Sequence, residues 1–344
     1  MKLAIVFGGA SFEHEISIVS AITVKSVLKY TPTFIFLDDS HNFYLIDAND
    51  MNAKTFSSGA YKKMKHLSLS HGGFEIGGMF GSKKLDISVV LNLVHGSDGE
   101  DGTLASLFDF FKIAYIGPRV EASMLSFNKV MTKAYAQSIG VKTLDYEVLY
   151  RGSSHVVKTA LPVIIKPARL GSSIGVSIVK EQKELEYALD TAFEYDDTIL
   201  IEPFIAGVNE YNLAGCKTDK FILSMVEEPQ KNEFLDFEKK YMDFSRTGAV
   251  SKADISASLE SRIKAMFERI YDPLFMGSLI RCDFFEIDGE VYLNEINPIP
   301  GSMAHYLFND FSTVIDAIAS NLPRKDKIST GYDYIHSISS AKGK

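Results

Sequence analysis

The residues whose spacing is most informative for chemistry lie near the C-terminal end, on two segments of alternating character. Arg281 and Asp283 are two residues apart on the first segment, and Glu295 and Asn297 are two residues apart on the second. Residues two apart on a strand share a face, so a hairpin could bring the four side chains together. Carboxylate and amide oxygens are ligands that Mg²⁺ prefers. The pattern predicts a divalent-metal site, with an ordinary polar sheet face as the alternative.

Whether the two pairs meet depends on the turn that joins the two segments. A two-residue turn would place Asp283 opposite Asn294 and leave Glu295 on the other face. A three-residue loop at 287–289, with Gly289 in the left-handed conformation, would restore the parity. We expect the three-residue loop, because it gathers the oxygen ligands on one face.

Two further segments could hold a nucleotide, although each has a plain structural alternative. Lys166 ends an apolar segment and precedes a loop of glycine and serine whose N–H groups could surround a phosphate; a flexible hairpin would look the same. The apolar segment 198–205 carries Glu202, which could accept a hydrogen bond from adenine, and Glu210 could accept from ribose hydroxyls. A buried strand with a surface glutamate is the alternative. The motifs G-x-x-x-x-G-K-[ST] and G-x-G-x-x-G are absent from the sequence, so a nucleotide would need another architecture.

Two more polar residues follow segments that resemble buried parallel strands. Residues 3–7 are apolar and end in two glycines, with Glu13 just beyond, and residues 86–94 end at His95. The carboxyl ends of parallel strands meet at one edge of a sheet, where open α/β sheets bind ligands. Glu13 could hold an ammonium group there, or it could simply favour the start of the following helix. His95 could equally be a structural residue.

The elements that position these residues divide into three parts and a tail. We expect an N-terminal doubly wound parallel-sheet α/β domain, a small central α+β domain and a C-terminal antiparallel-sheet α+β domain. The segment 50–84 is weakly patterned and expected to be peripheral, and 229–250 is expected to be a long mobile loop. The expected boundaries are 1–125, 126–208, 209–330 and a tail at 331–344 that is frayed from Tyr332 onward.

The composition narrows the class of protein. The chain has 344 residues, a formal net charge of −8, 46% apolar residues and 23% charged residues, as in globular domains. The acidic balance argues against a nucleic-acid partner. The two cysteines form neither a disulfide framework nor a zinc motif, which favours a reducing compartment. No apolar run approaches the roughly 20 residues of a membrane helix. We therefore expect a soluble, cytoplasmic protein with no membrane partner.

Considered together, the motifs resemble those of the D-alanine–D-alanine ligase family of the ATP-grasp superfamily. The resemblance runs in chain order from residue 1 to about residue 325. Single motifs are weakly specific, but their ordered set is strong. The motifs are G-G-A-S-F-E-H-E-I-S at 8–17, H-G-S-D-G-E-D-G-T at 95–103, K-P-A-R-L-G-S-S-I-G-V at 166–176, D-F-E-K-K-Y at 236–241, R-C-D at 281–283 and N-E-I-N-P-I-P-G-S at 294–302.

The resemblance implies an ATP-grasp fold and an ATP-dependent ligation of two D-alanine molecules through an acyl phosphate. ADP and phosphate would be released, and the dipeptide would enter peptidoglycan precursor synthesis. ATP and two Mg²⁺ (or Mn²⁺) ions would be the cofactors, D-alanine and ATP the small-molecule substrates, and the protein would be a homodimer. The segment 229–250 would be the lid that excludes water from the reactive acyl phosphate.

The resemblance also implies roles for individual residues. Those on the nucleotide would be Lys129, Lys166, Ser172, Ser173, Glu202, Pro203, Ile205, Glu210, Lys240, Asn294 and Glu295. Those on the metal ions would be Asp283, Glu295 and Asn297, and those on D-alanine would be Glu13, His95, Arg281, Gly301 and Tyr306. The catalytic set would be Glu13, Ser172 and Tyr241 as a hydrogen-bonded triad, with Arg281 and the N–H of Gly301 as the oxyanion pocket.

The second substrate leaves alternatives open. The family usually has a serine or similar hydroxyl residue where this sequence has Tyr306, at a position that contacts the carboxylate of the second substrate. D-lactate or D-serine are therefore alternative acceptors, although the pair Lys240-Tyr241 resembles the dipeptide-forming members. From another class, the alternative is a catalytically inert ATP-binding module.

Overall fold

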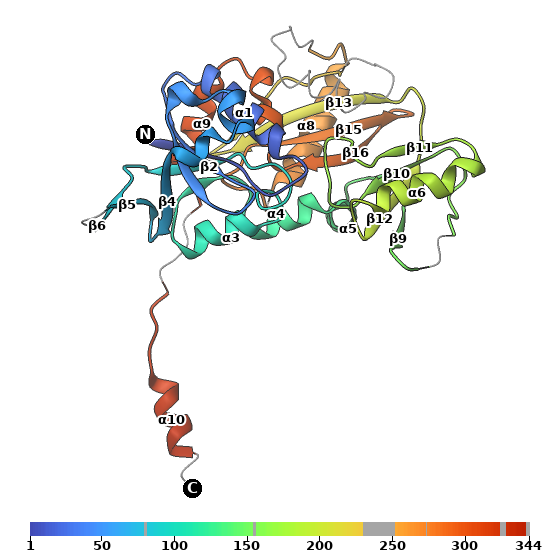
Figure 1. Ribbon diagram of the computed structural model, residues 1–344. Helices are drawn as coiled ribbons and strands as arrows, with labels where there is room; N and C mark the ends of the chain where they lie inside the picture. The colour runs from blue at the N-terminus through green and yellow to red at the C-terminus, as the bar shows by residue number, and fades with distance from the viewer. Residues whose placement is uncertain (79–80, 154–155, 230–251, 273, 324–327, 342–344) are drawn as a thin grey trace.

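The computed structural model describes residues 1–78, 81–153, 156–229, 252–272, 274–323 and 328–341. Within these residues the strands form three sheets, which follow one another along the chain (Figure 1). The first sheet is mixed and the other two are antiparallel. This agrees with the α/β and α+β classes that the sequence predicts.

The first sheet has, among the described residues, eight strands in the order β6-β5-β4-β3-β2-β1-β7-β8. Strands β2, β1, β7 and β8 are parallel, as predicted, whereas β3 to β6 add antiparallel strands at one side. The bounds are β1 Leu3–Gly8, β2 Thr33–Leu37, β3 Phe43–Ile46, β4 Lys65–Ser70, β5 Gly73–Gly78, β6 Gly81–Lys84, β7 Val89–Asn92 and β8 Tyr115–Ile116.

The segment 50–84 has more regular structure than its sequence pattern predicts. It forms strands β4, β5 and β6 at the edge of the sheet, after the short helices η1 Ala48–Asp50, α2 Ala53–Ser57 and η2 Ala60–Lys63. Strand β6 is exposed along its whole length, and β4 buries one side chain, Leu67. An edge that buries so little carries no apolar alternation from which strands could be recognised.

Helices cover both faces of the first sheet, so the predicted doubly wound arrangement is confirmed. Ile5 and Phe7 of β1 lie in one core together with Ile315, whereas Val6 lies in another core together with Phe108. Neighbouring residues of this strand thus point into different cores, which explains its continuous apolar run. The helices are α1 His14–Val27, α3 Thr103–Phe110, α4 Val120–Phe127 and α9 Phe311–Ser320.

The second sheet is small and antiparallel, with strand order β11-β10-β12-β9. Helix α6 packs against it through buried residues at helical spacing, from Leu185 to Phe193. Helix α5 connects it to the first sheet (Figure 1). The bounds are α5 Lys129–Ser138, β9 Glu147–Tyr150, β10 Val163–Pro167, β11 Ser177–Val179, η3 Gln182–Glu184, α6 Leu185–Phe193 and β12 Thr198–Pro203.

The third sheet is antiparallel, with strand order β14-β13-β15-β16. Helix α8 buries Ile263, Phe267 and Ile270 in the same core as the apolar side chains of β13 and β15. The bounds are β13 Asn209–Lys217, β14 Phe221–Leu223, α8 Ala257–Tyr271, β15 Ile280–Ile287, β16 Glu290–Asn297 and η4 Gly301–Leu307.

The turn between β15 and β16 differs from the prediction. Ile287 pairs with Glu290, so the connection is a two-residue turn, and its residues Asp288 and Gly289 both have positive φ. The expected three-residue loop is therefore wrong. The predicted side chains still reach a common face further along the hairpin, because the register of the two strands shifts next to Asp283.

This shift is a β-bulge on β16. Phe284 pairs with Leu293, and the next pair is Asp283 with Glu295, so Asn294 is the extra residue. Beyond the bulge, Arg281 pairs with Asn297. The predicted common face is thus confirmed, but a bulge produces it rather than the turn.

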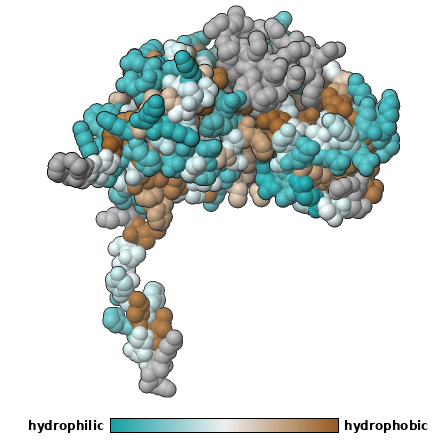
Figure 2. All heavy atoms as spheres, viewed as in Figure 1, coloured by the Kyte–Doolittle hydropathy of each residue, from teal (hydrophilic) through white to brown (hydrophobic). Residues whose placement is uncertain are grey.

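The tail also differs from its prediction. Residues Asp333–Ala341 form helix α10, whose described residues are all exposed and which extends away from the rest of the molecule (Figure 1). Ile335 and Ile338 are exposed on this helix. Figure 2 shows hydrophobic residues, coloured brown, on its surface. The expected frayed tail is therefore wrong for these residues. In the described part of the chain, no helix is both long and apolar enough to cross a membrane.

Candidate functional site

Two adjoining cavities lie where the three sheets meet. The first is lined by Glu13, His95, Glu100, Arg281, Asn297, Gly301 and Tyr306, among others. The second is lined by Lys166, Ser173, Glu202, Pro203, Ile205, Glu210 and Asp283, among others. Lys129, Gly171, Ser172, Asn294 and Glu295 line both cavities. Predicted site residues from distant parts of the chain are thus brought to one place.

Glu13 precedes helix α1 and is almost completely buried, with 5% of its surface exposed. Its Oε1 accepts a hydrogen bond from Ser172 Oγ at 2.6 Å. Its Oε2 is buried, and no residue in the described part of the chain gives it a hydrogen bond. Burial raises the pKa of this carboxyl group. A buried carboxylate with one oxygen left over suits a positively charged ligand such as an ammonium group.

The loop that carries Ser172 passes very close to Glu13. A Cβ atom at Gly171 would lie 2.8 Å from Glu13 Oε1, so the loop can approach the carboxylate only with glycine there. Ser172 and Ser173 have φ values of 55° and 59°, in the left-handed region. Lys129 Nζ donates a hydrogen bond to the carbonyl of Leu170, which holds the same loop from helix α5. The loop thus connects the second sheet to the N-terminal part of the site.

His95 lines the first cavity as a neutral side chain. Its Nε2 lies 3.0 Å from Ser20 Oγ, and the N–H of Ser302 donates to the same oxygen at 3.0 Å. Complete burial lowers the pKa of His95 to about 4. His95 therefore connects the first sheet to η4, which carries Gly301 and Tyr306.

The start of η4 has an unusual backbone. Ser302, Met303 and Ala304 have φ values of 48°, 55° and 48°, although none is glycine. Left-handed L-residues cost of the order of 1 kcal/mol each and cluster at functional sites. The Oγ of Ser302 is buried and finds no hydrogen-bond partner among the described residues. Both features lie next to Gly301, whose N–H was predicted to belong to the oxyanion pocket.

Glu100 is a site residue to which sequence reasoning assigned no role. It lines the first cavity, and its Oε2 accepts a hydrogen bond from the N–H of Gly96 at 3.1 Å. Burial and the neighbouring Glu13 raise its pKa well above the usual range. The signal for it was present, since Glu100 belongs to the same motif as His95, at 95–103.

Arg281 and Asp283 form a two-point ion pair on β15. Arg281 Nε lies 2.7 Å from Asp283 Oδ1, and Nη2 lies 2.8 Å from Oδ2. Asn297 donates its amide to Oδ2 of the same aspartate at 3.1 Å. The remaining Nη1 of Arg281 lies 3.5 Å from the hydroxyl of Tyr306. This arrangement directs a cationic group toward the first cavity.

The chemistry of the donor set fits a divalent cation. Burial raises the pKa of Asp283, and the adjacent Glu295 carboxylate raises it further. A cation between two crowded carboxylates would allow both to ionise. In the described residues no three His, Cys, Asp or Glu side chains form a metal-binding group, so the set consists of two carboxylates and the amide of Asn297. Such an oxygen set suits Mg²⁺ or Mn²⁺.

Glu202 on β12 is held by two lysines. Its Oε2 lies 2.8 Å from Lys166 Nζ, and its Oε1 lies 2.5 Å from Lys133 Nζ. Sequence reasoning did not identify Lys133. A signal existed, because Lys133 lies four residues after Lys129, a spacing that places two residues on the same face of a helix.

The other predicted residues divide into two groups. Pro203, Ile205 and Glu210 line the second cavity, and Asn294 Oδ1 lies 3.5 Å from Lys166 Nζ. Lys240 and Tyr241, with the rest of 230–251, lie outside the described residues. The described part of the predicted triad is therefore the contact between Glu13 and Ser172.

Comparison with known families matches both halves of the chain. The family described as D-ala D-ala ligase N-terminus matches residues 2–118, and the one described as D-ala D-ala ligase C-terminus matches residues 136–315. This chain belongs to the D-alanine–D-alanine ligase family. The sequence motifs therefore identified the family correctly.

Relatives in this family match over the full chain. The D-alanine–D-alanine ligases of Sulfurovum sp. and Campylobacter lari are 60% and 57% identical to it, over 100% of both chains in each case. The crystal structure of the D-alanine–D-alanine ligase from Helicobacter pylori is 51% identical, with a TM-score of 0.85, and covers 95% of this chain and 100% of that one. The expected ATP-grasp fold is thereby confirmed.

A structure with a different named acceptor also matches. The VanG D-Ala:D-Ser ligase from Enterococcus faecalis is 27% identical, with a TM-score of 0.76, and covers 93% of this chain and 98% of that one. The fold of this chain is therefore shared with a protein named for a D-serine acceptor.

Proposed function

We propose that this protein joins two D-alanine molecules to D-alanyl-D-alanine with ATP, releasing ADP and phosphate, for peptidoglycan precursor synthesis. The observation that carries the proposal is the position of Glu13. Its buried Oε2, which has no hydrogen-bond partner among the described residues, lies in the first cavity, and the residues that line both this cavity and the second are those expected around ATP phosphates. An amino acid held at Glu13 would face the nucleotide.

The second cavity would bind ATP. Lys129 and Lys166 would contact the α- and β-phosphates and Lys240 the γ-phosphate, with N–H groups of Ser172 and Ser173 beside them. Glu202, with the backbone at Pro203 and Ile205, would recognise adenine, and Glu210 would accept from the ribose. The lining of the second cavity by the described members of this set supports the assignment.

Asp283, Glu295 and Asn297 would hold two Mg²⁺ (or Mn²⁺) ions. When bound, the ions would offset the repulsion between the γ-phosphate and the substrate carboxylate. The raised pKa of Asp283, caused by burial and by Glu295, supports this assignment, since a cation would relieve the crowding. Asn294, at the bulge, would remain on the nucleotide side, near Lys166.

The reaction would proceed in two chemical steps. Glu13, aligned by Ser172 and Tyr241, would hold the ammonium of the first D-alanine while its carboxylate oxygen attacks the γ-phosphorus and ADP leaves. The amine of the second D-alanine would then attack the carbonyl carbon of the acyl phosphate. Arg281 and the N–H of Gly301 would stabilise the oxyanion, and collapse would expel phosphate, while the attacking amine loses a proton.

The remaining contacts concern substrate orientation and surroundings. His95 would line the first D-alanine subsite, and Tyr306 would contact the second substrate.

We also propose three structural units, at 1–125, 126–208 and 209–330, followed by a tail at 331–344. A homodimer in the cytoplasm, where ATP is available, would complete the assignment.

The test is product analysis with purified protein, ATP, Mg²⁺ and D-alanine. We expect D-alanyl-D-alanine and stoichiometric phosphate. Parallel reactions with D-lactate or D-serine as the acceptor, over a range of pH, test the role of Tyr306. A preference for D-lactate at neutral pH would overturn the acceptor assignment, and an absence of phosphate release with D-alanine would favour an inert ATP-binding module.

A further inference from the structure

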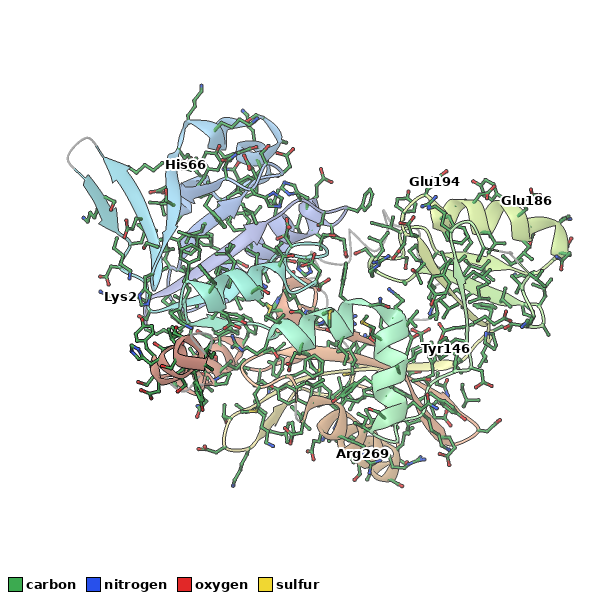
Figure 3. All side chains as sticks on the ribbon, turned by 90° about the horizontal axis from the view of Figure 1, so that it is seen from below. Lys2, His66, Tyr146, Glu186, Glu194 and Arg269 are labelled. Carbon is green, nitrogen blue, oxygen red and sulfur yellow. The ribbon has the colours of Figure 1, made fainter. Side chains whose placement is uncertain are left out.

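A buried lysine that lines neither cavity contacts the nucleotide site through Glu202. Lys133 on α5 has a side chain that is 3% exposed, and it is absent from the lining of both cavities. Its Nζ lies 2.5 Å from Glu202 Oε1 and donates to the carbonyl of Leu144 at 3.0 Å. Its ammonium lies 5.2 Å from the ring centroid of Tyr146, which is labelled beside α5 in Figure 3. Lys133 is thus fixed by three partners.

Lys166 contacts the same carboxylate from the cavity side. Its Nζ lies 2.8 Å from Glu202 Oε2 and a longer 3.5 Å from Asn294 Oδ1, and it lines the second cavity. Two ammonium groups therefore share one carboxylate, which leaves a net charge of +1 on Lys133, Glu202 and Lys166 together. A phosphate that enters the cavity can attract Lys166 without leaving Glu202 unpaired.

We propose that Lys133 is a positioning residue for nucleotide binding: it neutralises Glu202 and so keeps Lys166 available for the phosphates. This inference rests on the proposed function, in which Lys166 contacts phosphate. Without Lys133, Glu202 and Lys166 would form a closed neutral pair. Separating that pair to bind a phosphate would leave a buried carboxylate unpaired, which is strongly unfavourable.

The test compares ADP with adenosine as titrants of the full-length protein in calorimetry. We expect Lys133→Met to weaken ADP binding about tenfold or more, since a charged contact is affected, while adenosine changes less than about threefold. KM for ATP should rise by a similar factor, with a smaller change in kcat. Lys133→Gln, which can still donate to the carbonyl of Leu144, should weaken ADP binding as much as Lys133→Met does. Lys142→Met, at an exposed position, is the control and should leave ADP binding unchanged. Circular dichroism verifies that each variant is folded.

A double-mutant cycle separates the proposed role from a merely structural one. In the Glu202→Gln background the carboxylate that Lys133 is proposed to neutralise is gone, so adding Lys133→Met should change ADP affinity less than about threefold. An equal loss in both backgrounds, or an equal loss for adenosine, would overturn the inference. Absence of ADP binding by the wild-type protein would refute the proposed function itself, whereas wild-type binding with unaffected variants would refute this inference alone.

Discussion

Replacing Glu13 by glutamine should separate substrate binding from folding. Glutamine has nearly the same shape and can still accept the hydrogen bond that Ser172 Oγ gives to Oε1 at 2.6 Å. The change removes the negative charge and converts Oε2, to which no residue in the described part of the chain donates a hydrogen bond, into an amide nitrogen. The first D-alanine would then meet a neutral group where its ammonium needs a carboxylate.

The size of the effect follows from the burial of Glu13. A hydrogen bond to a charged group contributes about 1.5–3 kcal/mol, and about 1.4 kcal/mol corresponds to a tenfold change. We therefore expect kcat/KM for the first D-alanine to fall roughly 10- to 150-fold in Glu13→Gln. Because the carboxylate is 5% exposed, the effect should lie toward the upper end and resist added salt.

The stability of the empty protein should change in the opposite direction. Burial raises the folded-state pKa of Glu13, so folding favours the protonated form. The associated stability is present below the unfolded pKa and is lost as pH rises through the folded pKa. Glutamine does not ionise, so the melting temperature of Glu13→Gln should increase relative to that of the wild type as pH rises through this window.

The assays are phosphate release at saturating ATP and thermal unfolding between pH 4 and 8. Glu15→Gln is the matched control, because Glu15 lies two residues after Glu13, in the first turn of α1, and is exposed; it should change neither quantity. A folded Glu13→Gln protein with kcat/KM for D-alanine within threefold of the wild type would refute the assignment of Glu13 to the ammonium.

Three further predictions address other parts of the site. Asp283→Asn should raise the Mg²⁺ concentration for half-maximal phosphate release about tenfold or more, and an unchanged requirement would remove Asp283 from the metal set. Burial lowers the pKa of His95 to about 4, so up to about 3 kcal/mol of stability should be lost as pH falls from 6.5 to 4. In thermal unfolding, His95→Gln should show a weaker dependence of stability on pH over this range. An identical dependence in the variant and the wild type would contradict this prediction. Cys216 and Cys282 are buried, and burial raises the pKa of Cys216 to about 12. A thiol reagent at pH 8 should therefore modify the two cysteines only after denaturation. Rapid labelling of the native protein would contradict the burial of these cysteines.

Sequence patterns predicted well those elements that are buried on both faces. Strand β1 is an example, because its alternate residues enter different cores and its sequence is therefore a continuous apolar run. Strands β4 to β6 were not predicted, since they lie at a sheet edge and bury few side chains. A hydrophobic pattern indicates which residues are buried, so a strand that buries few residues has no such pattern.

The site shows a similar division between local and tertiary information. The common face of Asp283 and Glu295 could be inferred from the chemistry, but the bulge at Asn294 becomes visible only in the pairing of the two strands. The pairing of Lys133 with Glu202 joins residues 69 positions apart and needs the fold before it can be recognised. The resemblance to a family supplied the site residues that no single motif specified.

The transfer of oxygen from D-alanine to phosphate tests the central claim most directly, because it follows the atom that the two cavities are proposed to bring to the nucleotide. D-alanine labelled with ¹⁸O in both carboxylate oxygens would be incubated with ATP, Mg²⁺ and the protein, and the released phosphate analysed by mass spectrometry. Attack of the carboxylate on the γ-phosphorus predicts one ¹⁸O atom in each phosphate and one left in the peptide carbonyl. Unlabelled phosphate would mean that water attacks ATP instead, and it would contradict the account.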